Sequence, residues 1–331
     1  MSEALLDVRG LSTVFHTERG VFRAVDGISF TVGRGRTVGL VGESGCGKSV
    51  TSLSVMGLVA SPPGEVTAEA IRFDGQDLTR LGAEERRRLR GGKMSMIFQE
   101  PMTSLNPVHT IGAQIIEGIR AHMALSPAEA RERAIRMLEL VRIPAAAARV
   151  DDFPHQLSGG MRQRVMIAMA LACDPALLIA DEPTTALDVT IQAQILDLLR
   201  DLQQRLGMAI LIITHDLGVI AEIADEVLVM YAGKIVEGGD VRAIFDDPQH
   251  PYTIGLLGSI PRLDQDRARL ATIEGTVPSP NNQPPGCRFA PRCPFADARC
   301  HAEPPPLADL APGHRVACWK APVERHFGAA A

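Results

Sequence analysis

A glycine-rich segment ending in lysine and serine is the first feature that could perform chemistry. It reads Gly42-x4-Gly47-Lys48-Ser49 and lies between an apolar run at 37–41 and a stretch of helical character. In this Walker A pattern backbone N–H groups close around phosphate oxygens, the lysine reaches the β- and γ-phosphates, and the serine hydroxyl binds Mg²⁺. A glycine-rich turn without a ligand is the alternative. We expect ATP to contact Gly42, Glu43, Ser44, Gly45, Cys46, Gly47, Lys48, Ser49 and Val50.

Two adjacent carboxylates follow another apolar run. The sequence Leu-Ile-Ala at 178–180 leads into Asp181 and Glu182. A strand ending in this way brings Asp181 near Mg²⁺, usually through a water, while Glu182 can polarise the water that attacks the γ-phosphate. An ordinary strand end with acidic turn residues is the alternative, and the presence of a Walker A pattern in the same chain argues against it.

Four of the six cysteines lie near the C-terminal end, in the pattern Cys287-x5-Cys293-x6-Cys300-x17-Cys318. A cytosolic protein rarely stores disulfides, so the cluster indicates a metal site. The spacing is wider than that of zinc knuckles and favours a [4Fe–4S] cluster, with zinc and free or redox-paired thiols as alternatives. Three neighbouring arginines could offset the thiolate charge; they are Arg288, Arg292 and Arg299.

The cysteine inside the glycine-rich loop is a separate matter. Cys46 lies at a helix N-terminus, where the pKa of a thiol tends to fall and its reactivity tends to rise. The alternative is a small residue that fills a tolerant position, and this is the interpretation we favour.

Composition limits the function classes. The chain has 331 residues, which suits one large domain plus an appendage, and 46% of them are hydrophobic. The net charge of −5 disfavours a general nucleic-acid binder. No charge-free apolar run reaches the roughly 18 residues of a membrane span, and the acidic N-terminus lacks the features of a signal peptide. We expect a cytosolic protein that reaches the membrane through partners.

The elements that must position these residues alternate in type. Continuous apolar runs at 37–41, 177–180 and 208–213 predict buried strands of a parallel sheet, so the fold class is α/β. A helical insertion is expected at about 108–172, and a hairpin turned at Ala232-Gly233 near residues 226–237. Prolines are frequent after residue 250 and disfavour long helices and central strands. We predict a nucleotide-binding domain at 1–250 and a loop-rich cysteine module at 251–331.

The stretch from Leu157 to Arg164 points to a family. Its sequence, LSGGMRQR, resembles the signature motif of ABC-type ATPases, with Ser158, Gly159 and Gly160 at the start of a helix, suited to bind a γ-phosphate. Met161 stands where the family usually has Gln. Further family elements follow in order: the Q-loop at Gln99, the D-loop at Asp188, the switch histidine at His215, and an aromatic residue for adenine stacking at Phe15.

The resemblance implies a P-loop NTPase of ABC type, with a RecA-like core and a helical subdomain. It also implies Mg²⁺ bound by Ser49, Gln99 and Asp181, and hydrolysis carried out by Glu182 with His215 and Gln99. In this family two nucleotide domains meet head to tail. Residues 158–161 would therefore cap the ATP held by the partner, and ATP would hold the dimer closed until hydrolysis opens it.

Features outside the ATPase motifs resemble the dipeptide and oligopeptide importer ATPases, a group that includes nickel importers. These features are Pro101-Met102-Thr103-Ser104-Leu105-Asn106-Pro107, Tyr231-Ala232-Gly233, His250-Pro251-Tyr252-Thr253 and the cysteine tail. The resemblance implies a homologous second ATPase subunit, two transmembrane permease subunits and an extracytoplasmic solute-binding protein, at the cytoplasmic face of the bacterial inner membrane. The cofactors would be ATP, Mg²⁺ and the [4Fe–4S] cluster or Zn²⁺.

Three alternatives stay open. The first is that the solute is nickel or another small molecule, since the ATPase subunit never touches it. A soluble ABC ATPase of DNA repair or translation control usually carries two cassettes, a long coiled coil or an inserted zinc module, and none of these is apparent. A metal-sensing regulator with a decayed cassette is disfavoured because Glu182 and His215 are both present.

Overall fold

The computed structural model describes residues 4–18, 20–99, 104–185, 187–259 and 273–326. The chain divides into two compact units, each assembled from separate stretches. The first comprises Met1–Leu5, Val32–Arg36 and Asp74–Ile213; the second comprises Leu6–Thr31, Thr37–Phe73 and Thr214–Ala331. Two of the predicted positions that carry the family resemblance, residues 100–103 and Ala186, lie outside the described residues.

The centre of the first unit is a run of parallel strands. β8 (Leu177–Asp181) lies between β7 (Met94–Ile97) and β9 (Ala209–Thr214), and Asp181 is in register with Ile213. Every residue of β8 and β9 is buried, as expected for continuous apolar runs in a sheet covered on both faces. The strands predicted at 177–180 and 208–213 are therefore confirmed. Before β7 come β6 (Gln76–Asp77) and α2 (Ala83–Leu89).

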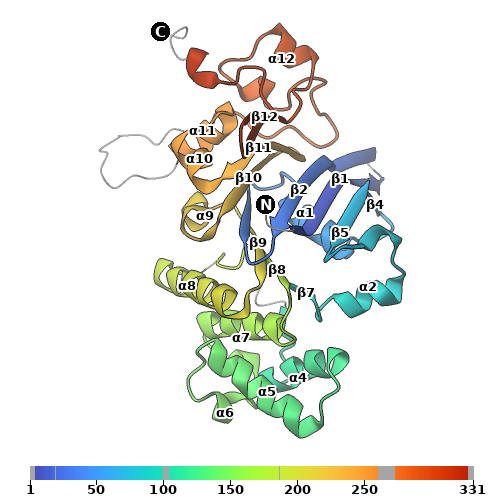
Figure 1. Ribbon diagram of the computed structural model, residues 1–331, viewed down its shortest axis with the longest axis vertical. Coiled ribbons are helices and arrows are strands. Elements are labelled where there is room, and N and C mark those ends of the chain that lie inside the picture. The colour runs from blue at the N-terminus through green and yellow to red at the C-terminus, as the bar shows by residue number, and fades with distance from the viewer. Residues whose placement is uncertain (1–3, 19, 100–103, 186, 260–272, 327–331) are drawn as a thin grey trace. The chain divides into compact units, whose positions relative to one another are not determined.

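The predicted helical insertion is confirmed in this unit. It contains α4 (Ile111–His122), α5 (Pro127–Leu140), the short α6 (Ala146–Arg149) and α7 (Gly159–Leu171), which lie together in Figure 1. Local signals start these helices: Ser126 caps α5 with Glu129 in a capping box, and Ser158 caps α7. α8 (Val189–Leu206) begins at Asp188 and ends at a left-handed Gly207.

The second unit holds two sheets. In one, β1 (Ala4–Thr17) lies beside β2 (Gly20–Gly33) and pairs antiparallel with β4 (Gly64–Thr67) and β5 (Ala70–Phe73). Sequence reasoning does not predict β1 and β2, because their buried residues are interspersed with half-buried and exposed ones rather than forming continuous apolar runs.

The other sheet of this unit has the strand order β12-β13-β11-β10-β3. β3 (Thr37–Val41) pairs parallel with β10 (Glu226–Tyr231), which forms the predicted hairpin with β11 (Lys234–Asp240). The helices of this unit are α1 (Lys48–Met56), α9 (Leu217–Ile223), α10 (Val241–Asp246), α11 (Pro251–Gly258) and α12 (Ala298–Ala302).

The C-terminal segment departs from one prediction. Although its prolines disfavour a central strand, β13 (His314–Val316) pairs with both β11 and β12 (Ala308–Ala311). The reason is that Pro304, Pro305 and Pro306 precede β12 and Pro312 lies in the turn between β12 and β13, so that no proline interrupts the pairing.

Candidate functional site

The glycine-rich loop has a backbone that only glycine adopts readily. Gly42 has φ 153° and Gly47 has φ 107°. A Cβ at Gly42 would lie 2.1 Å from the Met230 carbonyl oxygen, and one at Gly47 would lie 2.5 Å from the Ala24 carbonyl oxygen. The loop is thus packed tightly against the backbone at residues 24 and 230, and side chains at these positions would displace it.

The helix that follows the loop leaves its first turn without a side-chain cap. α1 begins after Gly47, which as a glycine has no side chain that could cap the helix. Lys48 is 5% exposed, and its Nζ donates to the carbonyl oxygens of Gly42 (2.8 Å) and Glu43 (3.0 Å). A buried ammonium inside a ring of backbone groups at a helix N-terminus is suited to bind phosphate.

Phe15 lies on β1 and is half-buried. Its ring stacks on that of Phe22 with a centroid distance of 5.3 Å. β1 is tied to the helix of the phosphate loop, because Thr13 Oγ1 and Ser54 Oγ are 2.7 Å apart and buried. The aromatic pair therefore belongs to the same unit as the phosphate loop and is joined to it through α1.

The predicted carboxylates are located at the end of β8 in the first unit. Asp181 is buried, and Glu182 has a left-handed φ of 48° with its N–H bonded to the Ile213 carbonyl (2.8 Å). A non-glycine residue in this conformation is strained, and such strain is often found at functional positions. The structure brings two polar side chains to the Glu182 carboxylate: Gln99 Nε2 donates at 3.2 Å and Thr185 Oγ1 at 2.8 Å. Sequence reasoning missed Thr185 as a partner.

The signature segment lies at the start of α7 in the same unit. Ser158 Oγ accepts from the Met161 N–H (3.4 Å), and Ser158 and Gly159 are exposed. A Cβ at Gly160 would lie 3.1 Å from Ile191 Cγ2 on α8, so this glycine permits close helix packing. Gln163 Nε2 donates to the Pro183 carbonyl (2.5 Å), which connects the signature helix to the segment that carries Glu182.

Asp188 and His215 both lie at the ends of elements. Asp188 is exposed and caps α8 by accepting from the Ile191 N–H at 2.9 Å. His215 is exposed directly after β9, and Asp216 caps α9.

The four C-terminal cysteines surround one small cavity of about 10 Å³, together with His250, Trp319 and Lys320. All four are free thiols, and burial raises the pKa of Cys293 to about 11 and that of Cys318 to about 12. In the part of the chain that the structure describes, no group of three or more His, Cys, Asp or Glu side chains has the geometry for a single metal ion.

Four thiols are the type of ligand that holds a [4Fe–4S] cluster. Each iron of such a cluster takes one thiolate, so the four sulfurs need not converge on one point. The cavity now has room for roughly one water molecule, and a cluster would need the cysteine loops to lie farther apart.

The predicted role of the three arginines is wrong. Arg292 pairs with Glu43, Arg288 bonds to Asp26 and the Ala232 carbonyl, and the guanidinium of Arg299 lies 3.5 Å from the centroid of the Trp319 ring. The cation whose charge acts on the thiols is Lys320, which lowers the pKa of Cys293 and Cys300 against the larger effect of burial. Its backbone N–H donates to Cys318 Sγ (3.3 Å). Sequence proximity could not reveal this, because it does not show which partner each arginine side chain meets in the folded chain.

Cys46 is 1% exposed, and burial raises the pKa of its thiol, although the nearby Lys48 acts in the opposite direction. The lowered pKa considered for a thiol at a helix N-terminus does not apply here. Desolvation outweighs the local positive potential, and the structure supports the interpretation of a small packed residue.

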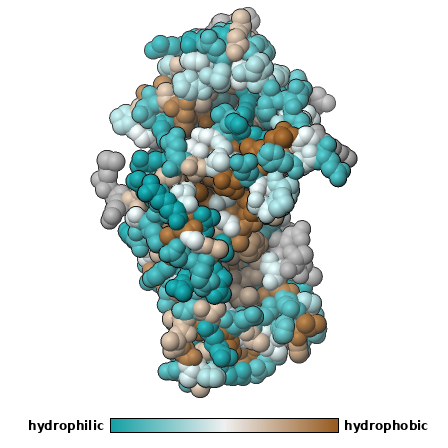
Figure 2. Space-filling model, turned by 90° about the vertical axis from the view of Figure 1, so that its right-hand side faces the viewer, coloured by the Kyte–Doolittle hydropathy of each residue, from teal (hydrophilic) through white to brown (hydrophobic). Residues whose placement is uncertain are grey.

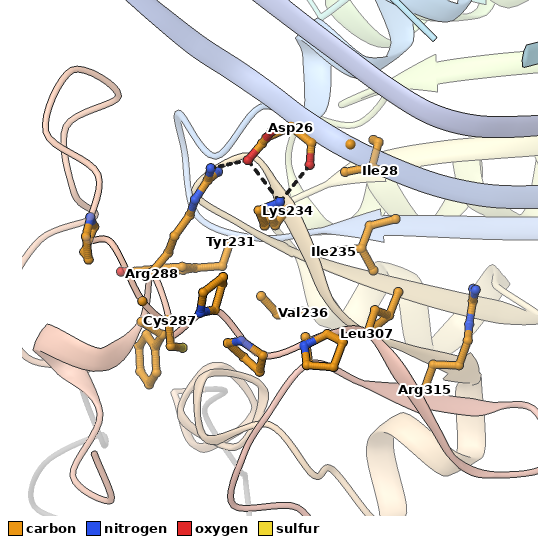
Figure 3. A pocket seen from close by; sticks show the side chains of 18 of the residues that line it. Asp26, Ile28, Tyr231, Lys234, Ile235, Val236, Cys287, Arg288, Leu307 and Arg315 are labelled. Atoms are coloured by element: carbon orange, nitrogen blue, oxygen red, sulfur yellow. Dashed lines mark hydrogen bonds and ion pairs between the residues drawn. The ribbon is translucent and has the colours of Figure 1, made fainter. Parts of the chain in front are cut away.

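A pocket of about 620 Å³ lies elsewhere in the second unit, between β2, β11 and the proline-rich loops (Figure 3). Arg288 and Lys234 both reach Asp26 in its wall. Burial would raise the pKa of Asp26, but hydrogen bonds from Arg23 and Lys234 and the charge of Arg288 outweigh it and lower this pKa to about 2. These charged groups satisfy one another and anchor the C-terminal segment to β2.

Comparisons with known proteins agree with this arrangement. The ABC transporter family model matches residues 25–185, and the model of the oligopeptide/dipeptide transporter C-terminal region matches residues 236–300. A model of an AAA domain described as a putative AbiEii toxin matches residues 150–221, a range that contains the signature segment and the two carboxylates.

Curated relatives are similar over nearly their whole length. The dipeptide transport ATP-binding protein DppD of Escherichia coli (strain K12) is 56% identical over 315 residues, which is 95% of this chain and 96% of that protein. The oligopeptide transport ATP-binding protein AppD of Bacillus subtilis (strain 168) is 53% identical over 315 residues, with the same two shares.

Solved structures show the same fold. The ATP-binding cassette MJ0796, as a dimer in a post-hydrolysis state bound to ADP and Pi, has a TM-score of 0.64 and 26% identity, and covers 72% of this chain and 99% of its own. CbiO1 from Clostridium perfringens, part of the ABC transporter complex cbiONQ, has a TM-score of 0.63 and 28% identity, with 74% and 92% covered.

Polar side chains are frequent on one face of the molecule (Figure 2). Hydrophilic residues dominate the face in Figure 2, and hydrophobic ones form separate patches. Among the described residues, no helix is long and apolar enough to cross a bilayer.

Proposed function

This chain belongs to the family of ATP-binding subunits of dipeptide and oligopeptide ABC transporters, and from this we propose that it hydrolyses ATP to power peptide import. The observation that carries the proposal is the extent of the likeness. It covers the ATPase motifs and also continues into the C-terminal region, where the model of the oligopeptide/dipeptide transporter C-terminal region matches residues 236–300. No observation favours nickel or another small solute instead.

We infer that ATP binds at the phosphate loop, with Lys48 on the β- and γ-phosphates and the N–H groups of α1 on the phosphate oxygens. The buried Lys48 and the glycine at the N-cap of α1, which leaves the backbone close to the loop, support this assignment. Ser49, Gln99 and Asp181 would hold Mg²⁺, which neutralises charge on the phosphates when bound. Phe15 would stack on adenine, extending the pair that it forms with Phe22.

For hydrolysis, Glu182 would orient and polarise the attacking water. Its carboxylate already accepts hydrogen bonds from Gln99 and Thr185, and these contacts hold it in one direction. His215 would contact the γ-phosphate from the end of β9. A backbone strained at Glu182 and bonded to Ile213 supports a fixed position for the general base.

The signature residues would act on a partner's nucleotide. Ser158 and Gly159 are exposed at a helix N-terminus, where an anion from another subunit has access. The exposed Asp188 and the 82% exposed Val189 would lie at the same interface. The partners would be a homologous second ATPase, two permease subunits and an extracytoplasmic solute-binding protein, at the cytoplasmic face of the inner membrane.

At the C-terminal end, Cys287, Cys293, Cys300 and Cys318 would hold a [4Fe–4S] cluster with a structural or redox-sensing role. Their convergence on one cavity supports this. Protein purified without oxygen should be brown, with broad absorption near ~400 nm and about four irons per chain. Colourless protein carrying stoichiometric zinc would overturn the cluster in favour of Zn²⁺.

Transport can be tested by purifying the tagged chain from detergent-solubilised membranes and identifying its companions. We expect a second ATPase and two permeases. The complex should then be reconstituted in liposomes together with its solute-binding protein. We expect transport of labelled dipeptide only when ATP is present on the side of the membrane that carries the ATPase subunits. Uptake of nickel with no uptake of peptide would reject peptide import, and the absence of any permease would reject a role in transport.

A further inference from the structure

One side chain of the C-terminal module reaches into the phosphate loop. Arg292 immediately precedes Cys293, yet its guanidinium forms a bidentate salt bridge with the carboxylate of Glu43. Nη1 donates to Oε2 at 2.7 Å and Nη2 donates to Oε1 at 3.1 Å. Glu43 is the second residue of the glycine-rich loop. The side chain of Arg292 is only 4% exposed and that of Glu43 is 30% exposed, so the pair is shielded from solvent and from salt.

Several neighbours hold Arg292 in this position. Its Nε donates to the Glu274 carbonyl (2.9 Å), its Nη2 to the Ile273 carbonyl (3.2 Å) and its Nη1 to Tyr231 Oη (3.3 Å). The guanidinium also lies 5.8 Å from the centroid of the Tyr231 ring. These contacts use both ends of the guanidinium fork, a geometry that lysine cannot reproduce.

The backbone of Glu43 is held from the same side. Its N–H donates to Tyr252 Oη at 2.8 Å, and the ring of Tyr252 packs edge-on against Tyr231 at 4.6 Å. The carbonyl of Glu43 in turn accepts from Lys48 Nζ at 3.0 Å. Glu43 therefore links the C-terminal module to the lysine assigned to the phosphates, through its side chain, its N–H and its carbonyl.

The charge of Glu43 makes the pair relevant to ATP. A carboxylate within the loop repels a triphosphate bound there, and the repulsion is strong where water is excluded. The paired guanidinium neutralises that charge. Because its neighbours already hold it in place, no further side-chain entropy is lost when ATP binds. We propose that Arg292 is a positioning residue of the ATP site, which fixes and neutralises Glu43 so that the loop accepts a triphosphate. This inference rests on the ATP site proposed above.

The proposal makes a sign-specific prediction for nucleotide affinity. Arg292→Gln leaves the Glu43 carboxylate uncompensated and should raise the Kd for ATPγS about tenfold, which lies within the usual range of coupling between sites. Glu43→Gln in the same chain removes the repelling charge, so the double variant should bind within about threefold of the original. The Kd of Arg292→Lys should lie between those of the original chain and Arg292→Gln, because lysine keeps the positive charge but cannot form the bidentate contact.

The test is calorimetric titration of the full chain with ATPγS, with the thermal midpoint of each variant measured alongside. Arg299→Gln is the matched control: it also lies beside a cysteine, but its side chain rests on Trp319. It should bind as the unaltered chain does. In ATPase assays Arg292→Gln should raise KM for ATP more than it lowers kcat.

The outcomes separate the two proposals. If the unaltered chain binds no ATPγS, the proposed ATP site fails. If it binds and Arg292→Gln binds equally well, the role of Arg292 alone is overturned. A double variant that binds ATPγS as weakly as Arg292→Gln would also overturn it. That result would mean that the affinity was lost through misfolding of the C-terminal module and not through the charge of Glu43.

Discussion

His314 Nε2 lies 2.8 Å from Glu237 Oε1 in the core of the second unit, where the side chains are 6% and 0% exposed. This pair joins β13 to β11. Glu237 also accepts from the backbone N–H groups of Gln249 (2.6 Å) and His250 (3.0 Å). One buried carboxylate thus holds the strand of the C-terminal segment and the start of α11 together.

The pair should make stability depend on pH. The hydrogen bond from His314 to Glu237 raises the pKa of His314 above the ordinary value of 6.5, against the effect of burial and with the help of Asp247. Its contribution is therefore fully present below about pH 6.5 and is lost as pH rises through the folded-state pKa. His250 does not titrate in this range, because burial lowers its pKa to about 4. His314→Gln should remove this pH-dependent part, as measured by thermal midpoints from about pH 6 to pH 9. A variant whose midpoint follows the same pH curve as the original would contradict the assignment.

Removing the carboxylate at Glu182 should separate binding from hydrolysis. Glu182→Gln keeps the shape and can still contact Gln99 and Thr185, but it is a poor base. ATP turnover should fall by about 100-fold or more while ATP affinity is kept, and the closed dimer should accumulate with ATP. Phosphate release and size-exclusion chromatography measure the two effects. Glu132→Gln on the exposed face of α5 is the control and should leave turnover unchanged; turnover of Glu182→Gln near the original rate would show that another group is the base.

A methyl group at Gly47 should disable the phosphate loop. The Cβ of Gly47→Ala would lie 2.5 Å from the Ala24 carbonyl, at a φ of 107° that alanine rarely adopts. Such strain costs about 1–3 kcal/mol and moves the N–H groups that face the phosphates. ATP affinity should drop by about tenfold or more. Gly118→Ala on α4, where nothing lies within 4 Å of the new Cβ, should retain affinity; equal binding by both variants would remove the loop from the ATP site.

Cys46 should react slowly with alkylating agents. The thiol is buried and its pKa is raised, so little thiolate is present at neutral pH. When alkylation does occur, it should slow ATP turnover, and bound ATP should protect, because Cys46 lies inside the loop. Peptide mapping by mass spectrometry after timed labelling measures this. Equal labelling of Cys46 with and without ATP would place the nucleotide away from this loop.

Local sequence determined much of the ATP site. The glycines of the loop, the apolar runs of β3, β8 and β9, and the caps at Ser158 and Asp188 all act within a few residues, so their spacing alone predicts where strands end and helices begin. The pattern of the four cysteines predicted a metal site. The structure groups the four around one cavity, but among the described residues no set of three or more His, Cys, Asp or Glu side chains could hold a metal ion.

Only the tertiary structure decided which distant groups meet. Arg292 is nearly 250 positions from Glu43 along the chain, and nothing in its neighbourhood distinguishes it from Arg288 or Arg299, yet folding directs the three guanidinium groups to three different partners. The pairing of β13 with β11 was equally hidden, since a three-residue strand has too short a pattern to be recognised. Side-chain direction and strand partnership depend on packing between remote segments, and sequence spacing carries information only about near ones.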